Sequence, residues 1–242
     1  LLARDSIHGA MEDPVELDGN YLIVKDQRVR VISGGEPGTI PWDALQADVV
    51  VDATGRFLTR EKLALHLESG AKRVLLTRNP KNEIDRYVIP GINESSISLS
   101  DEIISTTSST TQVLALMVKM LDETFGLKRA MMTTVHAYTA DQPLADVAGA
   151  DLRRSRSAVE NIIPNTTQSP DLVQRILPQY EGKIEGIAFN VPVPNGSCVD
   201  LTTELDQTPT VEQTNQAIKE FSENKLKGIV GYTSDPIVSS DV

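Results

Sequence analysis

The residues best suited to chemistry are a run of hydroxyls at the expected start of a helix. Seven consecutive Ser or Thr residues occupy positions 105–111. An apolar pattern with helical spacing follows from Val113 to Phe125, which predicts that Ser108 or Ser109 lies at the helix N-terminus. The free N–H groups and partial positive charge at such an end suit a bound anion or a nucleophile.

A histidine in the next element supplies a partner for this hydroxyl. His136 stands near the end of a strand predicted over residues 130–139. A hydroxyl at a helix N-terminus and a neighbouring imidazole form a possible nucleophile and base, so we nominate Ser109 and His136. The alternative is an ordinary capped helix, because Ser and Thr are preferred caps.

The other titratable candidates are interpreted as structural. His8 lies in a turn and His66 in an amphipathic helix, where a histidine is usually surface or core filler. Cys198 falls in a strand-like run and is expected to be a small buried residue rather than a nucleophile.

The elements before the hydroxyl run predict a doubly wound α/β sheet. Residues 21–24 and 29–32 form an expected hairpin, and the apolar strand 48–52 is of the kind buried in a parallel sheet. A helix capped by Thr59 and ended by Gly70 leads to a second buried strand, 72–77, which completes a β-α-β unit. Binding sites lie at the carboxyl ends of such strands. The residues expected there are Thr54, Gly55, Thr77 and Arg78.

The second half predicts an α+β domain with a mixed or antiparallel sheet. Strands are expected at 133–139, 185–191, 198–205 and 228–232, and helices at 112–125, 171–177 and 211–224. The intervening segment, 140–169, is long, polar and irregular, which is typical of a functional loop. We place the domain boundary so that the domains span residues 1–107 and 108–242.

Composition excludes several function classes. The chain has 242 residues, 40% of them hydrophobic, and a formal net charge of −11, which disfavours nucleic acid and anionic membranes as partners. One cysteine allows no internal disulfide, and three histidines form no zinc-spaced cluster. These features, with no membrane-length apolar run and no signal-peptide pattern at Leu1, favour a cytoplasmic protein.

Eight motifs together make the chain resemble the glyceraldehyde-3-phosphate dehydrogenase family over its whole length. They are DSIHG, DATGRF, GAKRVLLT, IISTTSSTTQ, MMTTVHAYTADQ, DLRRSRSAVENIIP, NVPVPNGSCVDL and LKGIVGYTSDPIVSSD. The resemblance implies a Rossmann-like domain that binds NAD or NADP and a second domain that oxidises an aldehyde through a cysteine thioester. It also implies a tetramer in which residues 140–169 contact a neighbouring subunit.

The resemblance assigns roles to individual residues, and several of them depart from the family pattern. Ser109 stands where the family has its cysteine nucleophile, and Asn190 where it has the arginine that binds substrate phosphate. Gln168 replaces a glycine beside Thr167. The positions that match the family's catalytic and phosphate-binding residues are Ser108, Thr110, His136, Thr139, Arg153 and Thr167.

Segments expected at both ends of the family pattern lie outside this sequence. No G-x-G-x-x-G fingerprint is present, so either the sequence is a piece of a longer subunit or a cofactor-binding start has been lost. We favour the first explanation, a piece of a longer subunit. A subunit that had lost the first strands of its sheet would be left with unpaired strand edges. A longer N-terminus could also carry an organellar transit peptide.

The combined prediction is a family member whose dehydrogenase chemistry is lost or much reduced. It would serve as a structural, binding or regulatory subunit, form oligomers with itself or with active members, and bind phosphate weakly. NAD or NADP binding is tied to the segment missing before Leu1. The alternative is an active enzyme, either a slow dehydrogenase or a Ser–His esterase using Ser109 and His136.

Overall fold

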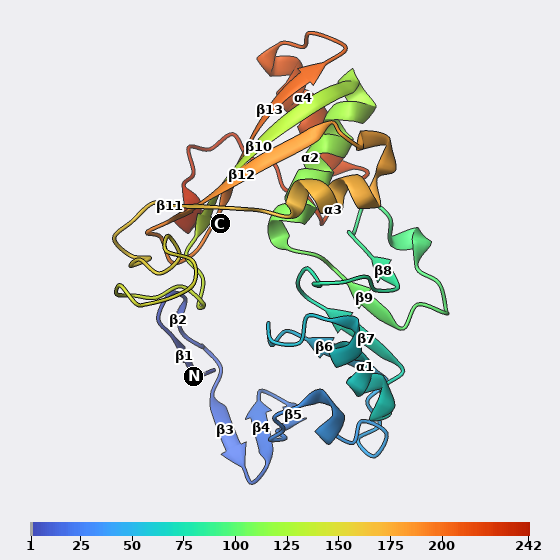
Figure 1. The fold of residues 1–242 in the computed structure, drawn as a ribbon, viewed down its shortest axis with the longest axis vertical. Coiled ribbons are helices and arrows are strands. Elements are labelled where there is room, and N and C mark those ends of the chain that lie inside the picture. The colour runs from blue at the N-terminus through green and yellow to red at the C-terminus, as the bar shows by residue number, and fades with distance from the viewer. Residues whose placement is uncertain (1) are drawn as a thin grey trace.

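The computed structural model describes residues 2–242 and arranges them around two four-stranded sheets (Figure 1). The strands are β1 Arg4–Asp5, β2 Gly9–Ala10, β3 Val15–Asp18, β4 Tyr21–Val24, β5 Gln27–Arg30, β6 Val49–Asp52, β7 Arg73–Leu76, β8 Arg86–Tyr87, β9 Ile103–Ser105, β10 Leu127–Ala137, β11 Ile163–Asn165, β12 Ile184–Val191 and β13 Cys198–Leu205. The α-helices are α1 Arg60–Glu68, α2 Ser109–Phe125, α3 Ser169–Ile176 and α4 Val211–Glu223, with short 3-10 helices at Pro37–Thr39, Glu94–Ser96, Pro178–Tyr180 and Ser239–Asp241.

The first of these sheets is parallel and confirms the predicted β-α-β unit. Its strand order is β6-β7-β9-β8, and every pair in it is parallel. The Thr59 hydroxyl caps α1 by accepting from the Lys62 N–H. Leu63 of α1 then packs with Val74 and Leu76 of β7. The apolar spacing of the sequence thus places one helix on one face of this sheet.

Strand β6 is less buried than its apolar sequence predicts. Val49 and Val51 are 56% and 57% exposed, whereas Val50 is 6% exposed. The strand lies at the edge of the sheet, and α1 covers only the face toward which Val50 points. The prediction of a strand buried on both faces is therefore wrong within this structure.

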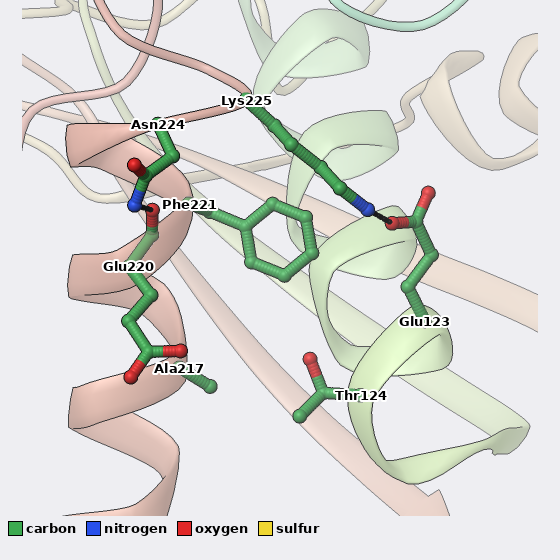
Figure 2. Close-up of a pocket in the computed structure, with 7 residues that line it drawn as sticks. All are labelled: Glu123, Thr124, Ala217, Glu220, Phe221, Asn224 and Lys225. Atoms are coloured by element: carbon green, nitrogen blue, oxygen red, sulfur yellow. Dashed lines mark hydrogen bonds and ion pairs between the residues drawn. The ribbon is translucent and has the colours of Figure 1, made fainter.

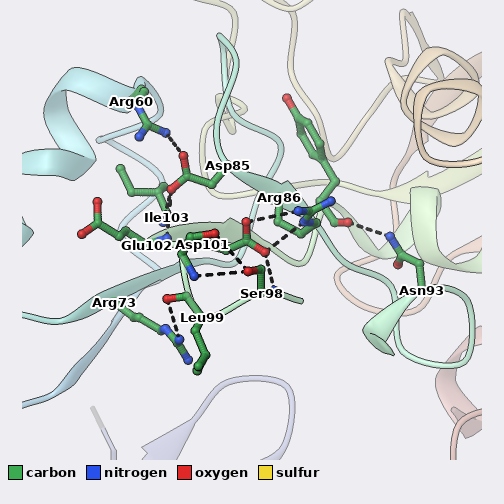
Figure 3. Close-up of polar contacts among 12 residues, drawn as sticks. Arg60, Arg73, Asp85, Arg86, Asn93, Ser98, Leu99, Asp101, Glu102 and Ile103 are labelled. Atoms are coloured by element: carbon green, nitrogen blue, oxygen red, sulfur yellow. Dashed lines mark hydrogen bonds and ion pairs between the residues drawn. The ribbon is translucent and has the colours of Figure 1, made fainter. Parts of the chain in front are cut away.

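Two carboxylates fix the loops around β8 and β9 (Figure 3). Asp85 accepts from the N–H groups of Glu102 and Ile103 at 3.0 and 2.8 Å and pairs with Arg60. Asp101 accepts from Nε and Nη2 of Arg86 at 3.0 and 3.2 Å. Strand β9 leads directly into α2, so these contacts hold the strand that precedes the hydroxyl run.

The second sheet is mixed, in the order β11-β12-β10-β13. Strand β12 runs parallel to β10, while β13 is antiparallel to β10 and β11 is antiparallel to β12. The mixed sheet expected for the second half is therefore confirmed, with its one parallel pairing between β10 and β12. A core beneath the sheet joins α2, β10, α3 and β12, as shown by Leu114, Met132, Val173 and Ile184.

Helix α4 lies against the C-terminal half of α2 and leaves a hollow of about 440 Å³ between them (Figure 2). Lys225 spans it, with its Nζ 2.8 Å from Oε2 of Glu123, and also lies over the ring of Phe221. Across residues 2–242, no helix is both long enough and apolar enough to cross a bilayer.

Three further predictions about the second half need correction. Residues 228–232 form no strand, because the N–H groups of Ile229 and Val230 both bind the Leu226 carbonyl and curl the chain into a turn. The irregular segment 140–169 contains the short strand β11, which pairs with β12. Cys198 is exposed rather than buried, since it begins the edge strand β13.

The N-terminal hairpin is confirmed, with its second strand starting at Gln27. The turn needs Lys25 at a φ of 52°, a conformation unusual for a residue with a side chain. Sequence reasoning missed β3, which adds a third antiparallel strand.

Candidate functional site

The hydroxyl run places Ser108 at the N-cap of α2 and Ser109 in its first turn. The Ser108 hydroxyl accepts from the Thr111 N–H at 3.2 Å, as expected for a Ser cap. Ser109 is exposed. Just before them, the buried Thr107 has a φ of 63°, which is rare for a β-branched residue and strains the backbone at the entry to the helix. Nothing in the sequence pattern pointed to this strain.

A chain of four hydroxyls joins the N-termini of α2 and α3. The Ser108 and Thr111 oxygens are 2.8 Å apart, Thr111 donates to Ser169 at 3.0 Å, and Thr167 donates to Ser169 at 3.1 Å. Ser108 and Thr167, nominated from the sequence, are therefore connected. The two residues between them, Thr111 and Ser169, are almost fully buried and were missed. Thr110, also nominated, lies on the same turn and is 9% exposed.

His136 lies near the carboxyl end of β10 and is partly buried. Its Nδ1 is 2.7 Å from the Ala137 carbonyl oxygen, which can only accept, so Nδ1 carries a hydrogen. In the neutral ring Nε2 is then the free base. No hydrogen bond joins His136 to Ser109 in the structure, and the group that orients the imidazole is a carbonyl rather than a carboxylate. The geometry thus provides a base but no Ser–His–acid triad.

Asn190 is directly opposite His136 in the parallel pairing of β10 and β12. It is 8% exposed, its Nδ2 donates to the Ala137 carbonyl at 3.3 Å, and its Oδ1 accepts from Asn165 at 3.0 Å. The Ala137 carbonyl therefore accepts hydrogen bonds from both the His136 imidazole and the Asn190 amide. Asn190 uses both ends of its side chain to join three strands and carries no charge to attract an anion.

Thr139 belongs to a polar cluster that sequence reasoning only partly identified. Its hydroxyl donates to Asp141 Oδ1, and Arg154 Nη2 is 2.5 Å from Asp141 Oδ2. Burial alone would raise the pKa of Asp141, but the Thr139 hydrogen bond and the charges of Arg154 and Arg78 hold that pKa below its ordinary value. Asp141 and Arg154 were missed, although the sequence has three arginines within residues 153–156.

No side-chain hydrogen bond links Arg153 to the hydroxyl chain within residues 2–242, and its N–H donates to Asp151 Oδ1 at 3.0 Å. It lines a separate hollow of about 510 Å³ together with Asp151, Thr166 and part of β12. Its neighbour Arg154, not Arg153, contacts the cluster around Thr139.

The residues nominated at the carboxyl ends of β6 and β7 do lie together. Thr54 donates to Asp52 Oδ1 through its N–H and its hydroxyl, at 2.9 and 2.7 Å, and the Thr77 N–H donates to the Asp52 carbonyl at 3.1 Å. Gly55 has a φ of 69°, and a Cβ there would come 2.7 Å from Nη1 of Arg78. The charge of Arg78 also lowers the pKa of Asp141, so the two groups interact electrostatically.

Comparison with known proteins identifies the family of this chain. Residues 108–242 match the model of the glyceraldehyde 3-phosphate dehydrogenase C-terminal domain, and residues 1–60 match that of its NAD binding domain. Glyceraldehyde-3-phosphate dehydrogenase 1 of Bacillus subtilis (strain 168) and the enzyme of Geobacillus stearothermophilus are each 44% identical to this chain over 242 residues. The enzyme of Podospora anserina is 41% identical over 243 residues. Each alignment covers 100% of this chain and 72% of the relative. The parallel α/β sheet, the mixed second sheet and these matches together show that the chain belongs to the glyceraldehyde-3-phosphate dehydrogenase family.

Proposed function

We propose that this family member has lost most or all of its phosphate-dependent aldehyde oxidation and acts as a binding or regulatory subunit. The observation that carries the proposal is Ser109 in the first turn of α2, where the resemblance expects a cysteine. A free cysteine with a pKa of about 8.5 is a few per cent thiolate at neutral pH, and a helix N-terminus increases that fraction. A serine hydroxyl is scarcely ionised under the same conditions, and its oxygen ester transfers an acyl group to phosphate less readily than a thioester.

The state of Asn190 supports the same proposal. An arginine at this position would offer a charged fork to a phosphate group, whereas Asn190 is neutral and is bonded to Ala137 and Asn165. Gln168, exposed at the N-cap of α3, brings a side chain where a glycine would permit close backbone approach.

Two parts of the proposed binding function concern small molecules. The first is a weak phosphate site at the N-terminus of α2. The free helix N–H groups and the hydroxyls of Ser108, Thr110 and Thr167 form it. The turn formed by Thr54 and Gly55, with Thr77 beside it, contributes to the NAD or NADP site of the complete subunit.

Association with copies of itself or with active relatives is the third part. Residues 140–169 carry several apolar side chains that are largely exposed, namely Leu144 at 70%, Leu152 at 81% and Ile162 at 66%. Exposed apolar groups concentrated on one long loop favour a protein interface. A cytoplasmic location completes the proposal, in keeping with the exposed, unpaired Cys198.

Steady-state assays of aldehyde oxidation test the proposal. With saturating aldehyde phosphate, inorganic phosphate, and either NAD or NADP, the rate should remain near the background without protein. Turnover comparable to that of the Bacillus subtilis relative, assayed in parallel, would refute it.

A Ser–His esterase is the second candidate, favoured by the free Nε2 of His136. Hydrolysis of an activated ester that disappears in both Ser109→Ala and His136→Gln would support it. Loss in neither variant would exclude it.

A further inference from the structure

A buried polar relay connects the single tryptophan of the chain to the turn at the end of β6. Nε1 of Trp42 donates to Nδ1 of His66 at 3.1 Å, and Nε2 of His66 faces Oδ2 of Asp52 at 3.5 Å. The other oxygen of Asp52 accepts both bonds from Thr54. Three separate elements, the 37–47 loop, α1 and β6, therefore meet at one carboxylate.

The indole fixes the tautomer of this imidazole. An indole N–H can only donate, so Nδ1 of His66 must be unprotonated, and in the neutral ring the hydrogen is on Nε2. This nitrogen is the one that lies 3.5 Å from Oδ2 of Asp52. His66 is 6% exposed and Asp52 is 2% exposed, and within residues 2–242 neither His66 Nε2 nor Asp52 Oδ2 has a hydrogen-bond partner at normal distance.

Few groups compensate the charge of the buried Asp52 carboxylate. Burial of a charge is costly unless hydrogen bonds or an opposite dipole compensate it. Here Thr54 satisfies Oδ1, and the His66 N–H dipole faces Oδ2. Moving the imidazole therefore changes the environment of the carboxylate, and through it the two bonds that hold Thr54.

We propose that Trp42 and His66 are positioning residues that act through Asp52 to hold the Thr54–Gly55 turn in the form presented to a ligand. This deepens the proposed function, because the turn is part of the nicotinamide dinucleotide site proposed above. Because coupling between two sites is reciprocal, a change at Thr54 must also change the environment of the Trp42 indole. The tryptophan is unique in the sequence, so its fluorescence reports the state of the turn.

Amide hydrogen exchange measured by NMR on the ligand-free chain tests the forward direction. Trp42→Phe removes the donor but keeps an aromatic ring on a partly buried position, so the fold should survive. Exchange of the Thr54 amide, which bonds Asp52, and of the Arg56 amide, which bonds the Thr54 hydroxyl, should become about tenfold faster, the effect of one weakened charge-assisted hydrogen bond. Leu45→Ala, a packing change in the same loop, should leave these two amides unaffected. Unchanged exchange in Trp42→Phe would overturn the proposal, as would an equal increase throughout α1 and β7.

Fluorescence tests the reverse direction. Thr54→Val removes an exposed hydroxyl that bonds Asp52, and it should shift or quench the Trp42 emission. The control is Thr39→Val, which removes a hydroxyl that bonds the Glu36 carbonyl. This change should leave the Trp42 emission unaltered. Emission unaltered by Thr54→Val would contradict the relay.

Adding NAD separates this inference from the proposed function. Slower exchange of the Thr54 amide in the presence of NAD would support both the relay and cofactor binding. If NAD has no effect while Trp42→Phe and Thr54→Val act as expected, cofactor binding by this chain is refuted and the relay is still supported.

Discussion

The hydroxyl of Thr111 donates to that of Ser169 across 3.0 Å, between residues 58 positions apart in the chain. This contact joins the N-terminal turns of α2 and α3 and brings Ser108 and Thr167 into one chain of hydrogen bonds. The hydroxyl run is therefore a tertiary connection as well as a helix cap.

Thr111→Val should destabilise the fold because it leaves the buried Ser169 hydroxyl without this donor. Thr111 is fully buried, and valine has nearly the same shape, so the loss is one of hydrogen bonding rather than packing. We expect the free energy of unfolding to fall by about 1–3 kcal/mol in urea denaturation. Thr110→Val is the matched control, since the Thr110 hydroxyl makes no side-chain hydrogen bond within residues 2–242. An equal effect of both changes would mean that the hydroxyl chain does not stabilise the fold.

Asp101 should make the fold sensitive to acid. Hydrogen bonds from Arg86 and from the Ser98 N–H hold its pKa below the ordinary value (Figure 3). A lowered folded-state pKa stabilises the fold fully above the unfolded Asp pKa of about 3.9, and this contribution is lost as the pH falls through the folded-state value.

Urea denaturation followed from neutral pH into acid measures this contribution. Asp101→Asn should be less stable at neutral pH and should lose less stability on acidification than the native chain. Asp26→Asn, an exposed carboxylate on a turn, serves as the control. Parallel curves for the native chain and Asp101→Asn would contradict the assignment.

Inorganic phosphate should bind weakly at the N-terminus of α2. Backbone N–H groups and the Ser108, Thr110 and Thr167 hydroxyls favour the anion, while the neutral Asn190 and the bulk of Gln168 oppose it. We expect a dissociation constant of about 1 mM, equivalent to about 4 kcal/mol. Titration with phosphate should shift the amide signals of Ser109 to Gln112 with saturation.

Two neighbouring threonines make the phosphate titration specific. Thr167→Val should weaken binding about fivefold, since one hydroxyl is lost, whereas Thr166→Val should not. Absence of saturable shifts up to tens of millimolar would mean that the hydroxyls serve only as structure.

Leu152 should contribute to self-association. Light scattering at micromolar concentration should give a mass above that of one chain, and Leu152→Glu should lower it by placing a charge among the exposed apolar side chains of residues 140–169. Leu99→Glu is the control, because Leu99 is 92% exposed but lies outside residues 140–169. A clean monomer in the native chain, with no binding to an active relative, would refute the prediction.

Local patterns in the sequence predicted the elements that depend on neighbouring residues. The cap at Ser108, the cap at Thr59 and the extent of α4 to within one residue follow from side chains a few positions apart. The strand predicted at 228–232 failed because a turn anchored by the buried Leu226 overrides the β propensity of its residues.

Features set by distant contacts could not be predicted in this way. The partner of Thr111 at Ser169, the shared carbonyl of Ala137 and the pairing of Asp141 with Arg154 depend on how separate elements meet. The exposure of Val49 likewise depends on the strand's place at the sheet edge, which its own residues do not encode.

The proposed loss of covalent chemistry at Ser109 is tested most directly in a single turnover. Protein at high concentration is mixed with one equivalent of aldehyde phosphate and excess NAD, while reduced cofactor is followed by absorbance and acylation of residue 109 by mass spectrometry. We expect neither a burst nor an adduct for the native chain. For Ser109→Cys we expect at most a partial burst, because Asn190 and Gln168 remain. A stoichiometric burst with acylated Ser109 in the native chain would contradict the proposed loss of this chemistry.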